Sequence, residues 1–281
     1  MAPTAPDGGL TRAVRQRLAL GRLLPLGSEG DGAWLAERAA QTVLRRACEG
    51  IGGAALGTLR VGPAAPDAPH GAPAVPAPPG ALPPGPLCVR AEFEAAPEEP
   101  LPVTAERLRA ALFAAAAERL GLAVTAVDLR VTGLLDGAPG RAGDAAPGRA
   151  QTEAAGHAPG GRAGVPGHAP GEVPEEPEEV ALFGRSGGGR PEPGSGEGAD
   201  LADEAARIAA AVPGVAGLTP VLGSRAVTYD GTALPRPHVR VELAVAGGRR
   251  AREVALAVRA ALGDTLPGRP SVAVLVTDVR D

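Results

Sequence analysis

The sequence predicts an α+β protein with two similar αββαβ domains, each a three-stranded mixed sheet with two helices, joined by a disordered linker. The first observation is periodicity, because apolar residues recur in the order helix, strand, strand, helix, strand in both 28–135 and 200–281. The second is composition, because the segment 136–199 is rich in Gly, Pro and Glu and lacks such periodicity. The third is a sequence match between the two regions.

The match between the two regions needs no gap. VRAEF at 89–93 is similar to VRVEL at 239–243, and LRAAL at 108–112 is similar to VRAAL at 258–262. Both pairs lie 150 positions apart. This agreement of order and spacing indicates an internal repeat.

An amphipathic helix is expected in the N-terminal segment, 1–27. Residues 10–24 place apolar side chains on one side of a helix, whereas Arg12, Arg15 and Arg22 lie largely elsewhere. Two interpretations remain open: the helix covers the first domain, or it binds a membrane surface or a partner.

The first unit, 28–135, is interrupted by a Pro-rich insertion at 63–86, which we expect to be disordered because its prolines disfavour both helix and sheet. The strict alternation around Phe93 is typical of a half-buried strand. The expected elements are a helix over 32–49, strands over 54–62 and 87–94, a helix over 104–120 ended by Gly121, and a strand over 123–132.

The second unit, 200–281, repeats this order. A strand expected within 215–229 is broken near Pro220 and Gly223, where proline and glycine disfavour regular pairing. The other expected elements are a helix over 200–212, a strand over 238–245, a helix over 249–262 and a strand over 271–279.

The two faces of this second sheet pose a question. Arg240 and Glu242 alternate with apolar residues, so they are expected on a polar face of their strand. The last strand, however, carries Leu275 and Val279 opposite a second apolar row. We therefore expect that its second face is covered, by the other domain or by another copy of the chain.

Composition argues against several functional classes. The chain has no lysine, which removes Schiff-base chemistry and the lysine of the P-loop. The formal net charge of −4 makes nucleic acid an unlikely partner. Cys48 and Cys88 are too few for a disulfide framework. No apolar run is long enough for a transmembrane helix, and a cytoplasmic location is expected.

Motifs with catalytic or metal-binding potential are weak. Gly184–Gly188 fits the pattern G-x-S-x-G but lacks the strand and helix that a nucleophile elbow needs. His157 and His168 lie in the predicted linker, without the ordered elements of a zinc site. We expect no catalytic residue, cofactor, metal or small-molecule substrate. The candidate interaction surface consists of Arg12, Arg15, Arg22, Arg249, Arg250, Leu275 and Val279.

Four segments of the C-terminal unit carry a family resemblance: LADEAARIAAAVPGVAGL at 201–218, VRVELAV at 239–245, REVALAVRAAL at 252–262 and SVAVLVTDV at 271–279. Together they resemble the bacterial alkaline-shock, or envelope stress response, protein family, and the repeat extends the resemblance to a degenerate copy in the N-terminal half. The abundance of Ala, Gly, Pro and Arg is typical of a high-GC bacterium. The chain departs from the family in its two copies, its Pro-rich insertion and its long linker.

The resemblance implies a non-catalytic scaffold or self-association protein of the envelope stress response, in the cytoplasm or at the inner face of the membrane. The implied partners are the chain itself or another envelope-associated protein, with peripheral membrane contact as a further expectation. The alternative is a nucleic-acid or regulatory ligand-binding module.

Overall fold

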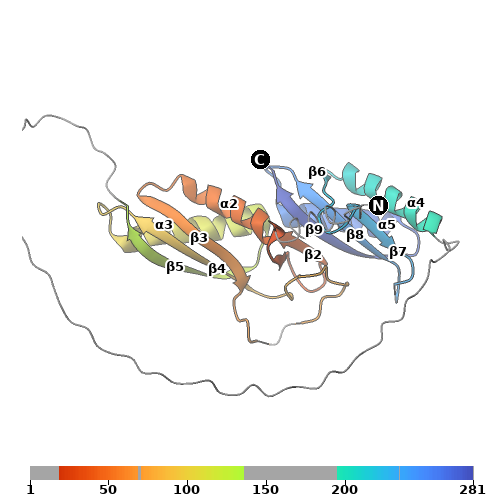
Figure 1. Ribbon diagram of the computed structural model, residues 1–281, viewed down its shortest axis with the longest axis horizontal. Helices are drawn as coiled ribbons and strands as arrows, with labels where there is room; N and C mark the ends of the chain where they lie inside the picture. Colours follow the sequence, from red (N-terminus) through yellow and green to blue (C-terminus); the bar gives the residue numbers. More distant parts are fainter. Residues whose placement is uncertain (1–18, 69–70, 136–194, 234, 281) are drawn as a thin grey trace, which may run out of the picture. The chain divides into compact units, whose positions relative to one another are not determined.

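A computed structural model describes residues 19–68, 71–135, 195–233 and 235–280. They form an α+β fold with two mixed sheets, as predicted (Figure 1). The predictions made for 10–18 of the N-terminal helix and for 136–194 of the linker lie outside the described residues.

The three-stranded sheet has the order β3-β4-β5, with β3 antiparallel and β5 parallel to the central strand. One face of β4 is buried through Val89, Ala91 and Phe93, beneath Leu108 and Leu112 of the second helix. Gly121 ends that helical stretch with φ 80°, a conformation that favours glycine. The elements are α2 (Glu37–Glu49), β3 (Ala54–Pro63), β4 (Leu87–Ala95), α3 (Leu101–Ala114), the π-helical turn η1 (Ala115–Leu120) and β5 (Val124–Leu134).

The six-stranded sheet has the order β1-β2-β9-β8-β6, and β7 also pairs with β8. Strands β6 and β7 are both antiparallel to β8, so the break expected near Pro220 and Gly223 separates two short strands on one neighbour. Strand β9 is parallel to β8. The elements are β1 (Leu23–Pro25), β2 (Ala33–Ala36), α4 (Ser195–Ala211), β6 (Val215–Leu218), β7 (Val227–Asp230), β8 (His238–Val245), α5 (Ala251–Thr265) and β9 (Ser271–Val279).

The N-terminal region differs from its prediction. The helix expected over 10–24 does not include Leu23–Pro25, which form β1, and the helix expected over 32–49 begins only at Glu37 because Ala33–Ala36 form β2. Gly21 has φ 69°, a left-handed backbone conformation that ends the helix before β1. Strand β2 pairs in parallel with β9, so residues from the first predicted unit complete the sheet of the second.

The Pro-rich insertion 63–86 is held in place where the structure describes it, contrary to the prediction of disorder. Val75 is buried, and the backbone N–H of Leu82 donates to the carbonyl oxygen of Leu23 at 2.8 Å. A second backbone bond joins Ala74 N–H to the Glu29 carbonyl oxygen at 3.0 Å. Proline-rich coil loses little conformational entropy on ordering, so a few such contacts can hold it.

Candidate functional site

The predicted arginine surface is only partly available for a partner. Arg22 donates from Nε to Glu37 Oε2 at 3.2 Å and from Nη2 to the Val61 carbonyl oxygen at 2.7 Å. Arg250 donates from Nε to the carbonyl oxygen of Ala117 at 2.9 Å. Arg249 is exposed, and Arg12 and Arg15 lie outside the described residues.

Leu275 and Val279 do not belong to an exposed surface. The side chain of Leu275 is fully buried and that of Val279 is 8% exposed, so this part of the interaction-surface prediction is wrong. Both faces of β9 are covered within the chain. The second apolar row of β9 therefore reflects an internal interface, which sequence alone could not distinguish from a contact between copies.

Glu242 overturns the prediction of a polar outer face on β8. Its side chain is fully buried. Its Oε2 accepts hydrogen bonds from the backbone N–H groups of Val221, at 2.6 Å, and Leu222, at 2.9 Å. Its Oε1 lies 3.5 Å from Nε of Arg240. The loop between β6 and β7 thus lies over this face. It supplies the backbone N–H donors that a buried carboxylate needs.

Two further carboxylates bind residues distant in sequence. Glu37 is buried; burial raises the pKa of its carboxyl, but hydrogen bonds from Arg22 and the Val61 N–H outweigh this and hold it below its usual value. Asp31 accepts a hydrogen bond from Arg252 Nη2 at 2.8 Å. Burial raises the pKa of Asp31, and the bonds from Arg252 and Ser28 lower it further than that. Both carboxylates therefore accept hydrogen bonds that hold distant segments of the chain together.

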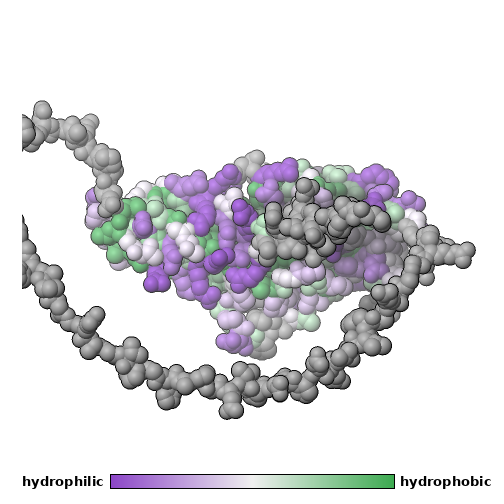
Figure 2. All heavy atoms as spheres, viewed as in Figure 1, coloured by the Kyte–Doolittle hydropathy of each residue, from purple (hydrophilic) through white to green (hydrophobic). Residues whose placement is uncertain are grey.

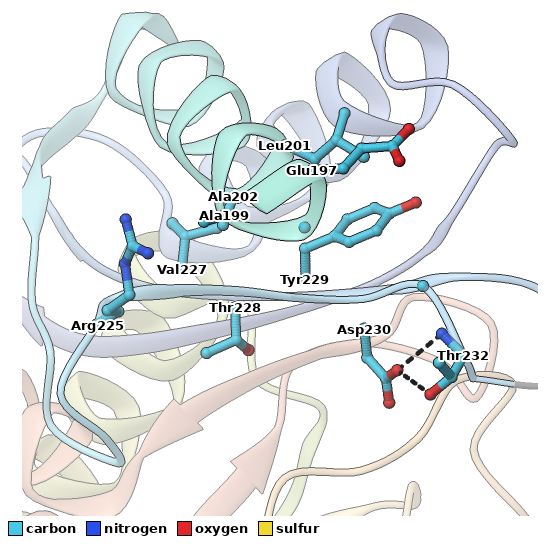
Figure 3. Close-up of a pocket in the computed structure, with 12 residues that line it drawn as sticks. Glu197, Ala199, Leu201, Ala202, Arg225, Val227, Thr228, Tyr229, Asp230 and Thr232 are labelled. Carbon is cyan, nitrogen blue, oxygen red and sulfur yellow. Dashed lines mark hydrogen bonds between the residues drawn. The ribbon is translucent and has the colours of Figure 1, made fainter. Parts of the chain in front are cut away.

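A cleft of about 640 Å³ lies between the N-terminal part of α4 and strand β7 (Figure 3). Its apolar lining includes Leu201, Ala202 and Val227. Figure 3 shows the ring of Tyr229 beneath the end of α4 that carries Glu197. The sequence analysis did not find this cleft, because its walls come from a helix and a strand whose packing the sequence does not reveal.

The polar groups of this cleft are largely engaged. Asp230 accepts hydrogen bonds from the N–H of Thr232 at 2.9 Å and from its hydroxyl at 2.7 Å. These bonds hold the pKa of Asp230 below its usual value, so the group stays a carboxylate at neutral pH. Arg225 is paired with Asp203 of α4. On the side of Tyr229, the cleft offers the Glu197 carboxylate and the aromatic face to a ligand, which suits a positively charged group (Figure 3).

The face of the three-stranded sheet that points away from its helices carries rows of opposite charge. Arg90 of β4 lies opposite Asp128 of β5, with Nε and Oδ2 3.7 Å apart. Arg130 of β5 lies opposite Glu92 of β4, again at 3.7 Å. These side chains are mostly exposed, so each pair contributes about 0.2–1 kcal/mol to stability.

Strand β5 lies at an edge of this sheet, because β4 is its only pairing partner among the described residues. The large apolar side chains that remain exposed in the described part of the chain all lie on β5 or on the first turn of α3. Figure 2 shows hydrophobic residues gathered over this region. The four side chains are Leu101 (39% exposed), Val103 (47%), Val131 (40%) and Leu134 (61%). We call these four residues the β5 patch.

Other chemical groups give no further site within the described ranges. No cluster of three or more His, Cys, Asp or Glu side chains there could hold a metal ion. His238 Nδ1 lies 2.8 Å from Ser271 Oγ, and burial lowers the pKa of this imidazole. His157, His168 and the G-x-S-x-G segment lie outside the described residues. None of the described helices is long and apolar enough to cross a membrane.

Comparison with known proteins gives no relative: no family model, no curated protein and no solved structure matches this chain.

Proposed function

We propose that this chain is a non-catalytic scaffold that works by self-association, in the manner of envelope stress response proteins. The observation that carries the proposal is the β5 patch beside an open strand edge. An apolar patch next to unpaired backbone groups is typical of a surface that another polypeptide covers.

The same proposal includes two αββαβ units derived from one repeat. The bounds of the elements support it, since β4 begins at Leu87 and β8 at His238, and α3 begins at Leu101 and α5 at Ala251. Strands β4 and β8 each have an antiparallel neighbour on one side and a parallel neighbour on the other. This common order agrees with the 150-position spacing of the matching segments.

The family resemblance of the C-terminal unit adds the biological setting to the proposal. We propose that the protein acts in the cytoplasm or at the inner face of the membrane, with itself or another envelope-associated protein as partner. Exposed arginines such as Arg249 are suited to peripheral contact with anionic lipid.

Sedimentation velocity over a range of protein concentrations tests self-association. The wild-type chain should form a larger species as concentration rises, and Leu134→Glu should weaken this association without changing the melting temperature, because Leu134 is exposed. Ala211→Glu, at an exposed position of α4, is the matched control and should associate like the wild type. A wild-type chain that stays monomeric at high concentration contradicts the proposed function.

A regulatory ligand-binding module is the second candidate, favoured by the cleft at Tyr229. The Glu197 carboxylate and the Tyr229 ring suit an organic cation. A thermal-shift screen with organic cations, and with organic anions of similar size as the control set, tests it. Stabilisation by cations that disappears in Tyr229→Ala would support this candidate, and no stabilisation by any cation would exclude it.

A further inference from the structure

The structure assigns the β5 edge to one occupant: we infer that two copies of the chain pair through β5, antiparallel, about a two-fold axis at Leu129. The inference rests on the proposed self-association and adds the surface, the register and the charges that determine it. It would join the two three-stranded sheets into one continuous sheet.

The backbone of β5 has an outward-facing side in its central part. At the two ends of the strand, the Ala123 carbonyl oxygen and the Leu135 N–H bond toward β4, at 2.8 and 2.9 Å. Between these ends the register shifts twice, and the Val127 carbonyl oxygen accepts a long bond, 3.5 Å, from Arg109 Nε of α3. Each shift inserts one extra residue into β5, so the alternation of backbone groups toward and away from β4 is reversed between the two shifts. In this central part, the backbone N–H and C=O groups of Val127, Leu129 and Val131 face the open edge.

The charges of β5 favour a single register. With the axis at Leu129, Asp128 lies opposite Arg130 of the second copy, and Arg130 lies opposite Asp128 of the second copy. A shift of the axis by one residue would place Asp128 or Arg130 opposite itself, and like charges directly opposite destabilise a sheet. Both side chains are largely exposed in one chain, at 67% and 79%, and so are free to meet a second copy.

The ion pairs within each chain continue the alternation of charges on both sides of the proposed β5–β5 contact. Arg90 lies opposite Asp128, and Glu92 lies opposite Arg130. Across the two-fold axis, one row then reads Arg90, Asp128, Arg130 of the second copy and Glu92 of the second copy. Its charges alternate in sign over four adjacent strands. An unrelated strand would have no reason to match this row, whereas a second copy matches it by symmetry.

The apolar side chains agree with the same register. On the other face of β5, Val127 would lie opposite Val131 of the second copy, and Leu129 would lie beside its own counterpart. Val131 is one of the exposed residues of the β5 patch, and Leu129 is only half-buried. Pairing would remove both from water, which is the main favourable contribution to such an interface. The axis also bisects the strand Val124–Leu134, so the two strands overlap over their full length.

Charge reversal tests the inference directly. Asp128→Arg alone and Arg130→Asp alone each place like charges opposite at two symmetric positions, and each should raise the self-association Kd about tenfold or more. The double variant Asp128→Arg/Arg130→Asp restores opposite charges between the two copies and should bring the Kd below that of either single variant. It loses the pairs with Arg90 and Glu92 within each chain, so its Kd should stay above the wild-type value. An equimolar mixture of the two single variants should also associate, because each supplies the charges that the other lacks. Analytical ultracentrifugation measures all four samples.

Controls separate this interface from loss of fold and from other surfaces. Arg60→Asp changes one charge on the same sheet face at the opposite edge strand, and should leave the Kd unchanged. Thermal unfolding of each variant shows whether the fold is retained. Leu129→Cys gives a second, independent readout: directly opposed residues of an antiparallel pair lie close enough for a disulfide, so mild oxidation should cross-link this variant and not Thr58→Cys on β3.

The outcomes distinguish the inference from the proposal on which it rests. A wild-type chain that never associates overturns both. Two results together would overturn the β5 pairing and leave self-association through another surface. They are an equal Kd for the wild type and the single charge variants, and no cross-linking of the Leu129→Cys variant.

Discussion

Glu242 and Leu222 are joined by a 2.9 Å hydrogen bond, in which the backbone N–H of Leu222 donates to a glutamate carboxylate without any exposed surface. The bond joins the segment between β6 and β7 to strand β8 of the six-stranded sheet. A buried carboxylate is stable only where such donors satisfy it. The fold of this half of the protein therefore depends on a charged residue at a position where an apolar one would be expected.

Replacement of Glu242 should be costly. Glu242→Ala removes the acceptor of two backbone N–H groups and a neighbour of Arg240, so we expect a loss of about 3–5 kcal/mol in the free energy of unfolding. Glu242→Gln keeps an acceptor oxygen and should cost less. Denaturant titrations of both variants measure this, and equal stability of Glu242→Ala and wild type would contradict the role given to this carboxylate.

Glu37 should make stability depend on pH. Its folded pKa lies below the ordinary value of 4.5, because the bonds from Arg22 and Val61 outweigh the effect of burial. The corresponding stability is complete above the unfolded pKa and is lost as the pH falls through the folded pKa. Melting temperatures from pH 7 to about pH 3 should fall more steeply for wild type than for Glu37→Gln. Parallel curves for the two proteins would show that Glu37 does not contribute.

The two thiols should react slowly in the folded chain. Burial raises the pKa of Cys48 to about 11. Burial also raises the pKa of Cys88, and the adjacent Asp128 carboxylate, with Oδ2 3.3 Å from Sγ, raises it further. Asp128→Asn should therefore speed labelling of Cys88 by a thiol reagent at pH 8. Cys48 is the internal control, and a peptide map that shows equal acceleration at both cysteines would indicate general loosening instead.

Two leucines provide a matched test of the N-terminal strand. Leu24 of β1 is fully buried and Leu134 of β5 is 61% exposed. Leu24→Ala should cost about 2–5 kcal/mol in the free energy of unfolding, whereas Leu134→Ala should change it by less than about 0.5 kcal/mol. Chemical unfolding measures both, at a protein concentration where the wild type is monomeric. A neutral Leu24→Ala would mean that β1 is not part of the core.

Cleavage between the two halves should not separate them. Strand β2 pairs with β9 through Leu35 and Val276, and Arg252 binds Asp31. A specific protease site inserted at Gly188 gives two fragments that should stay together on a sizing column in native buffer and separate in denaturant. Fragments that elute apart in native buffer would contradict the pairing of β2 with β9.

The sequence predicted the regular elements well wherever one period dominated. The alternation at Val239 and Val241 indicated the strand that the structure gives as His238–Val245, and the helix end at Gly121 followed from the residue that left-handed backbone favours. The strand alternation and the helix end both depend on local backbone and side-chain preferences, which do not require knowledge of distant segments.

Prediction was wrong where burial is continuous on all sides. Leu23 and Leu24, and likewise Trp34 and Leu35, are consecutive buried residues, so no period distinguishes strand from helix. The predictions that Leu275 lies on an interaction surface and Glu242 on a polar outer face were also wrong. Whether a sheet face is covered depends on segments far away in the chain. The β5 edge could have been suspected from the self-complementary order of Asp128 and Arg130, but only the strand order shows that this strand is outermost.

The pairing of β2 with β9 also sets an order of events during synthesis. Ala33 of β2 is made long before its partner Val274 of β9, and at about 5–20 residues per second the ribosome needs roughly ten to fifty seconds to cover the distance between them. For that time β2 has only β1 beside it, and the edge that will pair with β9 stays open. The apolar side chains of Trp34 and Leu35 are then exposed to chaperones on the nascent chain. Strand β9 therefore completes a sheet whose first two strands were made long before it.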